Sequence, residues 1–182
     1  MKELQVNSDI RLKEIEFEDV KPIFEIIDKE RVYLSQWLPF VDETRDISYT
    51  RTFVENYMEM PADEFTFTIF YQQKLVGLVG MKDTDFENKK TEIGYWLSES
   101  YQNLGIMTLS VQKLIELIFE ELHLNRIQIK SAIGNFKSQQ IARRIGFIFE
   151  GIERQGELHE RGFVDLEVYS LLEKDYRQLY IN

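Results

Sequence analysis

A short turn around Gly105 has the residue types and the spacing of an anion-binding loop. Residues 102–108, "QNLGIMT", join an expected strand at 90–98 to an expected helix at 105–122. The first N–H groups of a helix have no partner inside it, and the positive end of the helix dipole lies among them. A glycine there lets the backbone approach a ligand closely, so the turn is suited to a pyrophosphate. An ordinary helix start that carries a glycine for steric reasons has the same pattern. The turn alone therefore does not distinguish an anion-binding loop from an ordinary helix start.

The composition narrows the chemistry that the chain can perform. The sequence has no cysteine, which excludes disulfides, thiolate metal ligands and a cysteine nucleophile. Its two histidines, His123 and His159, are too few for a histidine-rich site, so we expect no metal. Lys and Arg total 22 against 32 Asp and Glu, and the net charge of −10 disfavours nucleic acid and favours cationic partners.

The length and the apolar content indicate a single domain over residues 1–182. A chain of 182 residues with 43% hydrophobic residues can bury a core, but it is short for two domains. The first twenty residues lack an apolar signal core, and no segment approaches the roughly 20 apolar residues that span a bilayer. We therefore expect a cytoplasmic protein with no membrane partner. A homo-oligomer is compatible with the sequence.

Hydrophobic spacing predicts a strand and then helices in the first third of the chain. Residues 8–14 alternate like a strand, and "VKPIFEIIDKE" from Val20 has helical spacing. The aromatic-rich stretch 31–40 is predicted to be a turn or a short helix that ends at Pro39. Residues 48–60 are predicted to form another helix, stopped by Pro61.

In the middle of the chain, apolar and polar residues alternate with the period of a strand. Residues 65–71 and 74–83 are separated by only "QQ" and predict a hairpin, which 90–98 extends. The strongest predicted helix follows at 105–122. Its expected apolar face contains Leu109, Val111, Leu114, Ile115, Ile118 and Phe119.

The last third predicts a strand at 125–132 and a helix at 135–146 that Gly146 closes. "FIFEG" and "FVDLEVYSLL" are predicted to be two final strands around a polar loop at 153–162. The full order indicates an α+β fold around a mostly antiparallel sheet. The strand–helix–strand segment 90–131 should form a right-handed parallel crossover.

Two sequence blocks resemble the GNAT N-acetyltransferase superfamily. "IGYWLSESYQNLGIMTLSVQKLI" is similar to its acetyl-CoA-binding motif, in which Gln or Arg precedes two residues, a glycine, one residue and a Gly or Ala. Gln102 and Gly105 match the motif, whereas Met107 replaces its last small residue and Asn103 stands where a glycine is usual. The "GIMT" variant is typical of the RimJ/RimL-type branch, the ribosomal-protein N-acetyltransferases.

The second block, "NFKSQQIARRIGFIFEG", is similar to the signature N-x-x-S…GF-x-x-EG of that branch. The matching residues are Asn135, Ser138, Gly146, Phe147, Glu150 and Gly151. "YLSQWLPF" at 33–40 and "GFVDLEVYSLL" at 162–172 fit the branch as well. The resemblance implies a GNAT-like acyl-CoA N-acyltransferase fold, with a mixed, mostly antiparallel sheet, flanking helices and a splayed pair of parallel strands.

The resemblance also implies acetyl-CoA as the co-substrate. The backbone of Tyr95, Trp96 and Leu97 would hold the pantetheine arm, and an N–H group there would stabilise the tetrahedral oxyanion. The pyrophosphate and the rest of the cofactor would be bound by Gln102, Asn103, Leu104, Gly105, Ile106, Met107, Thr108 and Asn135.

The implied leaving-group donor is Ser138. Many members of the superfamily carry a tyrosine seven residues after the motif asparagine, but this sequence has Ala142 there. The resemblance to the RimL-type enzymes suggests that Ser138 donates a hydrogen bond or a proton to the thiolate. The alternative is that Ser138 only caps or packs the start of its helix.

Two carboxylates are candidates for the general base. Glu157 occupies the place of the branch's proposed catalytic glutamate and would accept a proton from the ammonium, directly or through water. Glu92 is its rival because a side chain on the splayed strand is held more rigidly than one on a loop. A solvated surface carboxylate is the alternative for both, and His159 lies in the same loop as Glu157.

The resemblance implies acetyl transfer to a primary amine, with the N-terminus of a ribosomal protein as one acceptor. Two other functions remain open at this stage. One is the same chemistry on a polyamine, an aminoglycoside or another small amine. The other is a non-catalytic acyl-CoA-binding module, which the alanine at position 142 favours.

Overall fold

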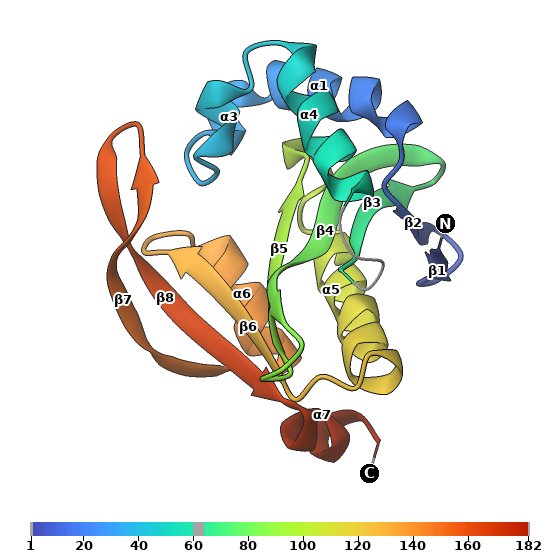
Figure 1. The fold of residues 1–182 in the computed structure, drawn as a ribbon, viewed down its shortest axis with the longest axis vertical. Coiled ribbons are helices and arrows are strands. Elements are labelled where there is room, and N and C mark those ends of the chain that lie inside the picture. The colour runs from blue at the N-terminus through green and yellow to red at the C-terminus, as the bar shows by residue number, and fades with distance from the viewer. Residues whose placement is uncertain (1, 60–63, 182) are drawn as a thin grey trace. The chain divides into compact units, whose positions relative to one another are not determined.

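The computed structural model describes residues 2–59 and 64–181, and the chain divides into two compact units. The first unit is Met1–Gly80 with Tyr95–Ser110, and the second is Met81–Gly94 with Val111–Asn182. Figure 1 traces the chain through both units. The single domain over 1–182 stays a prediction.

The first unit contains a sheet in the order β1-β2-β3-β4-β5. These strands are β1 (Glu3–Gln5), β2 (Ile10–Glu14), β3 (Thr66–Tyr71), β4 (Lys74–Asp85) and β5 (Lys90–Leu97), and the last two continue into the second unit. Pairing of β1 with β2, of β2 with β3 and of β3 with β4 is antiparallel, which confirms the predicted hairpin. Its two turn residues, Gln72 and Gln73, both have positive φ, at 46° and 69°, as a two-residue hairpin turn requires.

The helices of the first unit include the two that were predicted, one from Val20 and one over 48–60. They are η1 (Phe17–Asp19), α1 (Val20–Lys29), α2 (Arg31–Leu34), α3 (Phe40–Glu43), α4 (Ile47–Met58) and η2 (Glu99–Tyr101). The prediction that Pro39 ends a helix is wrong, because α2 ends at Leu34 and Pro39 is the N-cap of α3. Pro61 lies outside the described residues. Asp46 caps α4 by accepting a hydrogen bond from the Ser48 N–H at 2.7 Å.

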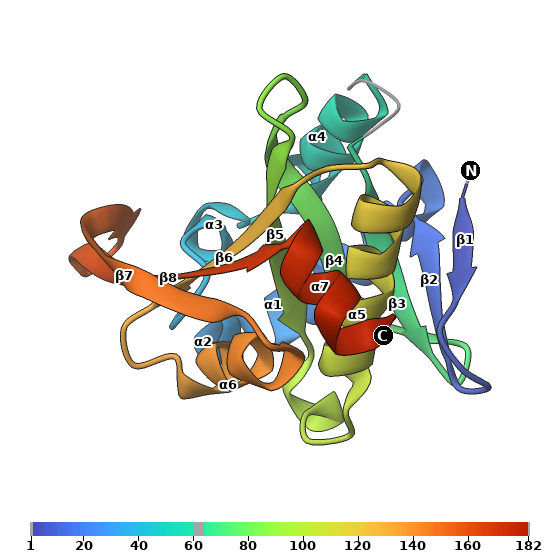
Figure 2. The same ribbon diagram turned by 90° about the horizontal axis from the view of Figure 1, so that it is seen from below.

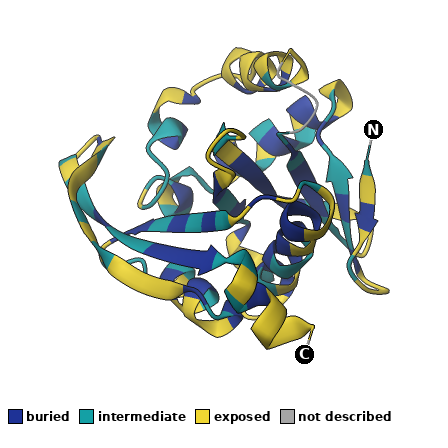
Figure 3. Ribbon diagram, turned by 60° about the horizontal axis from the view of Figure 1, so that its bottom comes forward, coloured by how far each residue is buried: buried dark blue, intermediate teal, exposed yellow. Residues whose placement is uncertain are grey.

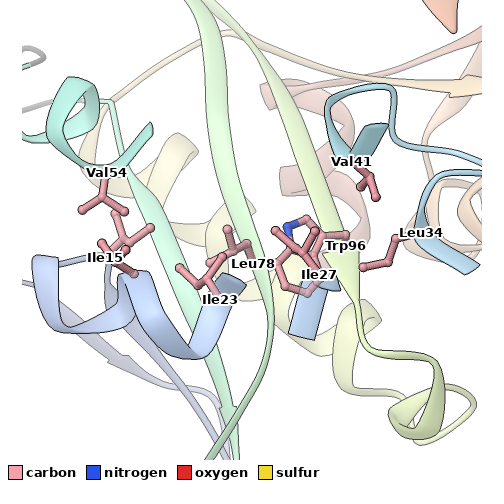
Figure 4. Close-up of a cluster of buried hydrophobic side chains, with 9 residues drawn as sticks. Ile15, Ile23, Ile27, Leu34, Val41, Val54, Leu78 and Trp96 are labelled. Atoms are coloured by element: carbon pink, nitrogen blue, oxygen red, sulfur yellow. The ribbon is translucent and has the colours of Figure 1, made fainter. Parts of the chain in front are cut away.

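A cluster of buried apolar side chains packs α1 and α4 against the sheet of the first unit. Figure 4 shows Ile23 and Ile27 of α1 beside Leu78 of β4 and Trp96 of β5. The cluster consists of Ile15, Val20, Ile23, Ile27, Leu34, Val41, Val54, Leu78 and Trp96. Burial of this apolar area fixes the C-terminal half of β5, the strand that the resemblance assigns to cofactor binding.

The sheet of the second unit has the order β4-β5-β6-β8-β7. Its further strands are β6 (Arg126–Ala132), β7 (Ile148–His159) and β8 (Gly162–Leu172). Pairing of β5 with β6 is parallel, with Glu92 opposite Gln128, whereas β8 is antiparallel to both β6 and β7. The predicted α+β fold with one parallel strand pair is confirmed.

The long helix begins at Ile106 and changes its winding near its end. It consists of α5 (Ile106–Glu116) and a π-helical segment, η3 (Leu117–Glu121). The predicted apolar face is buried except at Leu109, which is 37% exposed, so that assignment was wrong for this residue.

Two shorter helices complete the second unit, α6 (Phe136–Ile145) and α7 (Glu173–Tyr180). Gly146 ends α6 with a φ of +101°, as predicted for a glycine C-cap. Residues 173–180 gave no sequence signal for a helix because Tyr176 is the only one of them that is buried. Its ring lies 5.1 Å from that of Phe119, and Figure 2 shows α7 beside the long helix.

The predicted polar loop at 153–162 is wrong. Strands β7 and β8 continue through this segment to a tight turn, with Glu157 opposite Val164 and His159 opposite Gly162. The register shifts between Glu153 and Glu157, which interrupts the alternation that would have indicated a strand. Figure 3 shows how much of β7 is exposed, and an exposed edge strand carries the polar residues that sequence patterns attribute to loops.

An ion pair joins β6 to β7 in the second unit. Both terminal nitrogens of Arg126 donate to Glu150, at 2.7 and 2.6 Å, and the Ser170 hydroxyl donates to the same carboxylate at 2.7 Å. These hydrogen bonds, above all those from Arg126, lower the pKa of Glu150 from 4.5 to about 2. The stabilisation is therefore fully present above pH 4.5 and is lost as the pH falls through about 2.

We expect Glu150→Gln to lower the free energy of unfolding at pH 7 by about 1 kcal/mol, a value reduced for solvent screening. The reduction is needed because the Glu150 side chain is 39% exposed. The difference from the unmodified protein should shrink between pH 4.5 and pH 2 in urea unfolding. Glu160→Gln, at an exposed turn residue, is the control. A difference that does not change over this pH range would contradict the assigned cause.

Candidate functional site

The turn before α5 has the backbone geometry of an anion cradle. Asn103 and Gly105 both have positive φ, at 62° and 76°, and the Leu109 N–H closes the first helical turn onto the Gly105 carbonyl at 3.1 Å. A Cβ added at Gly105 would meet nothing within 4 Å, so the space over the helix start is open. Asparagine tolerates the left-handed region better than other non-glycine residues, which explains how Asn103 can stand where the motif has glycine.

Side chains of α2 and of its N-cap residue, Glu30, hold the segment that leads into this turn. Glu30 accepts from the Ser98 hydroxyl at 2.6 Å and from the Glu99 N–H at 2.8 Å, and the Gln102 side-chain amide donates to the Tyr33 hydroxyl. Burial, with the nearby carboxylates of Glu99 and Glu30, raises the pKa of Tyr33, so its hydroxyl stays protonated at neutral pH. No sequence pattern indicated the roles of Glu30 and Tyr33, because their partners lie more than 65 residues away along the chain.

Strand β5 can offer backbone groups to a ligand at Tyr95–Leu97, but one of its side chains is committed to the core. Trp96 is 7% exposed and belongs to the apolar cluster, so its indole is unavailable to a cofactor. The Ser98 N–H donates to the Val76 carbonyl at 2.8 Å, which pairs the end of β5 with β4. A Cβ at Gly77 would collide with the Trp96 carbonyl oxygen and lie 3.0 Å from the Leu97 Cα.

We expect Gly77→Ala to displace β5 at residues 96–97 and to destabilise the fold by about 1–3 kcal/mol. The added methyl group cannot be accommodated by a side-chain movement, because the atoms that it meets belong to the backbone. Thermal unfolding would measure the loss. Gly94→Ala, on β5 itself, is the control, since a Cβ there would meet only the end of the Lys82 side chain at 3.7 Å. Equal melting temperatures for the two variants would contradict this close approach.

The start of α6 brings Asn135 and Ser138 together. Asn135 is the N-cap, and its side-chain oxygen accepts from the Ser138 N–H at 3.3 Å. The capping role that was the alternative for Ser138 is therefore performed by Asn135, whose amide nitrogen can donate to a ligand. Ala142, at the position of the superfamily tyrosine, is fully buried. The hydroxyl of Ser138 remains the candidate donor to the leaving group.

The hairpin end of β7 brings Glu157 and His159 together. The His159 Nε2 lies 2.7 Å from a carboxylate oxygen of Glu157, and the imidazole side chain is only 3% exposed. Glu157 is half-buried, with 33% of its side chain exposed, so one face of the carboxylate stays accessible. A carboxylate that is held by a buried imidazole and open to a substrate suits proton transfer.

Glu92 lies in a different environment. It is buried, and Lys82 Nζ lies 2.7 Å from one carboxylate oxygen. Gln128 Nε2 donates to the other oxygen at 3.0 Å, and Lys130 Nζ lies 3.8 Å from it. Since both oxygens of Glu92 are engaged by donors, the geometry favours Glu157 over Glu92 as a base.

Two absences hold for the described residues, 2–59 and 64–181. Within these ranges no group of three or more His, Cys, Asp or Glu residues is arranged to hold a metal ion. Within the same ranges, no helix has the length and apolar character needed to cross a membrane.

The chain is similar to known acetyltransferases. A family model described as an acetyltransferase (GNAT) domain matches residues 9–148. The protein YdaF of Bacillus subtilis is 35% identical over 176 residues, which cover 94% of this chain and 96% of YdaF. A ribosomal-protein-serine acetyltransferase of Escherichia coli is 32% identical over 172 residues, covering 92% of this chain and 94% of that protein.

A solved structure shares the fold over nearly the whole chain. It is a RimL ribosomal L7/L12 alpha-N-protein acetyltransferase in complex with coenzyme A. The TM-score is 0.91 at 26% identity, and the match covers 96% of this chain and 99% of that one.

Proposed function

Because the chain belongs to the GNAT acetyltransferase family, we propose that it transfers the acetyl group of acetyl-CoA to the N-terminal amine of a ribosomal protein. The observation that carries the proposal is the left-handed turn at Asn103 and Gly105, open at the start of α5, in a chain that matches a coenzyme A-bound RimL structure along 96% of its length. The acceptor class follows the names of the relatives, which act on ribosomal proteins. Such an acceptor would place the enzyme in the cytoplasm.

In this proposal the chain's own groups bind the cofactor at two places. The N–H groups at the start of α5 bind the pyrophosphate, helped by the positive end of the helix dipole. The backbone of β5 at Tyr95–Leu97 pairs with the pantetheine arm. An N–H group there stabilises the oxyanion of the tetrahedral intermediate, an effect worth about 3 kcal/mol in comparable sites.

The transfer needs a neutral amine and a proton for the departing thiolate. Glu157 takes a proton from the substrate ammonium, directly or through water, while His159 holds the carboxylate in place. The amine nitrogen then attacks the thioester carbonyl carbon, and the C–S bond breaks as the tetrahedral intermediate collapses. Ser138 donates a hydrogen bond or a proton to the thiolate, and the second proton that the nitrogen loses as the amide forms either protonates the thiolate or restores the serine hydroxyl. The products are an acetylated amine and free coenzyme A.

A panel of acceptors tests this proposal. The purified protein is titrated with acetyl-CoA by calorimetry and then incubated with ribosomal proteins, polyamines and aminoglycosides, and mass spectrometry identifies the acetylated product. We expect acetyl-CoA binding and one acetyl group on a ribosomal protein N-terminus. Acetylation of small amines alone would identify a small-molecule acetyltransferase.

The buried Ala142 favours one further candidate, a non-catalytic acyl-CoA-binding module. Such a module keeps the cradle at 102–108 but lacks a working acid and base. Binding of acetyl-CoA without turnover across the whole panel would support it.

A further inference from the structure

Strand β7 is irregular immediately before Glu157, in the hairpin that it forms with β8 (Figure 1). The register of the two strands shifts between Glu153 and Glu157, so residues 154–156 lie opposite Asp165 of β8 alone. Such bulges are common beside active sites, where they redirect a side chain. The place of this bulge, directly before the carboxylate proposed as the base, points to the same use.

The bulge changes the position of Glu157 along β8. Glu153 pairs with Leu166, and in a regular ladder Glu157 would then lie opposite Gly162. It lies opposite Val164 instead. Two residues of a strand span about 7 Å, so the bulge moves the proposed base by that distance along its partner strand. The movement is toward Leu166, which pairs with the last residue of β6.

Asp165 holds the bulge through its side chain. Its Oδ1 accepts a hydrogen bond from the Gln155 N–H at 2.8 Å. Gln155 has a φ of +53°, a left-handed conformation that is unfavourable for residues other than glycine unless the surroundings support it. A carboxylate that accepts from a backbone N–H forms one of the stronger hydrogen bonds in proteins. The Asp165 side chain therefore supplies the support that this conformation needs.

The backbone of Asp165 is tied to the connection that leads to Ser138. Its carbonyl accepts from the Ile133 N–H at 3.0 Å, just beyond the end of β6. Ile133 begins the connection from β6 to α6, whose N-cap Asn135 accepts from the Ser138 N–H. All of these residues belong to the second unit. One residue thus contacts both the segment before the proposed base and the segment before the proposed acid.

We propose that Asp165 is a positioning residue for the base. Its carboxylate holds the bulge that places Glu157, and its backbone carbonyl ties the same point of β8 to the connection before Ser138. The inference rests on the proposed function, because it needs Glu157 to act as the base. Asp165 acts through Glu157 and takes no part in the proton transfers. Loss of its carboxylate should therefore lower kcat and leave the binding of acetyl-CoA unchanged.

The experiment compares Asp165→Ala with Asp165→Asn in the full chain. Alanine removes the acceptor of the Gln155 N–H, whereas asparagine keeps an acceptor oxygen. We expect Asp165→Ala to lower kcat about 10- to 100-fold, as for a catalytic group displaced by about 1 Å, with acetyl-CoA affinity unchanged in calorimetry. Asp165→Asn should keep most of the activity. Hydrogen exchange of the Gln155 amide, followed by NMR, should become faster in the alanine variant only.

Two comparisons distinguish positioning from a loss of stability. Asp85→Ala removes a hydrogen bond of the same kind, accepted from the Asn88 N–H at 2.8 Å in the turn between β4 and β5. It should lower the melting temperature without changing kcat. Asp165→Ala added to Glu157→Gln should lower kcat no further, because the position of the base matters only while the base is present.

Full activity of folded Asp165→Ala would overturn the inference. Losses that multiply in the double variant would do the same, since Asp165 would then act independently of Glu157, and so would equal losses in Asp165→Ala and Asp165→Asn. An unmodified protein that acetylates no amine would overturn the proposed function and this inference with it. If Asp165→Ala does not fold, Asp165→Thr gives the same test, because threonine suits a strand but is too short to reach the Gln155 N–H.

Discussion

Replacing Glu157 with glutamine should lower kcat about 100- to 10,000-fold while leaving acetyl-CoA affinity unchanged, as expected for removal of a general base. The glutamine amide keeps the size of the side chain but cannot take a proton from the substrate ammonium. Binding of the cofactor should persist because the residues proposed to hold it lie at β5, at the start of α5 and at α6. Steady-state kinetics with acetyl-CoA and an acceptor peptide would measure the loss, and calorimetry would measure the affinity.

Glu160→Gln is the matched control, since this exposed glutamate lies on the turn three residues further along the same hairpin. It should retain full activity. The rival assignment is tested with Glu92→Gln, and its melting temperature must be measured as well, because the change removes the partner of Lys82. If Glu157→Gln remains active and a folded Glu92→Gln does not, Glu92 is the base.

Gly105→Val should weaken acetyl-CoA binding by about 100-fold. Two effects combine: valine is strained at a φ of +76°, and its side chain enters the open space where the pyrophosphate is proposed to lie. Loss of two charge-assisted hydrogen bonds at about 1.5 kcal/mol each would produce a change of this size. Calorimetric titration with acetyl-CoA is the measurement.

Gly151→Val is the control that distinguishes backbone strain from obstruction of the proposed pyrophosphate position. Gly151 also has a positive φ, of +149°, and a Cβ there would likewise meet nothing within 4 Å. It lies on β7, away in sequence from the turn at 102–108, so its substitution should lower the melting temperature without changing cofactor affinity. Unchanged affinity in folded Gly105→Val would refute the cradle.

The parts of the fold that hydrophobic spacing predicted are those in which one face is buried. The helix from Val20 buries Val20, Ile23 and Ile27 at the predicted spacing, and the hairpin of β3 and β4 forms across its two-residue turn. The parallel pairing of β5 and β6 followed from connection rules and is confirmed.

The errors occur where tertiary contacts rather than apolar patterns define the element. Residues 153–159 are polar on an exposed edge, so only their pairing with β8 makes them a strand. Helix α7 is held by Tyr176, a single buried residue, which is too little for a periodic signal. Leu109 was assigned to the apolar face of the long helix by its spacing, yet it lies at an exposed position of α5.

In the candidate site, too, local features could be predicted from the sequence, whereas features that depend on tertiary contacts could not. The turn at Gly105 could be predicted because its chemistry is local, and the structure adds that Asn103 takes the left-handed conformation. The donors around Glu92 and the imidazole beside Glu157 depend on strand register, which no sequence pattern gave.

Acetyl transfer from acetyl-CoA to the N-terminal amine of a ribosomal protein can be tested directly. The most direct measurement incubates the protein with isotope-labelled acetyl-CoA and purified ribosomal proteins, quantifies free thiol and locates the label by mass spectrometry. We predict one labelled acetyl group on an N-terminal amine for each thiol released. A protein that binds acetyl-CoA yet releases no thiol and labels no amine would contradict the claim.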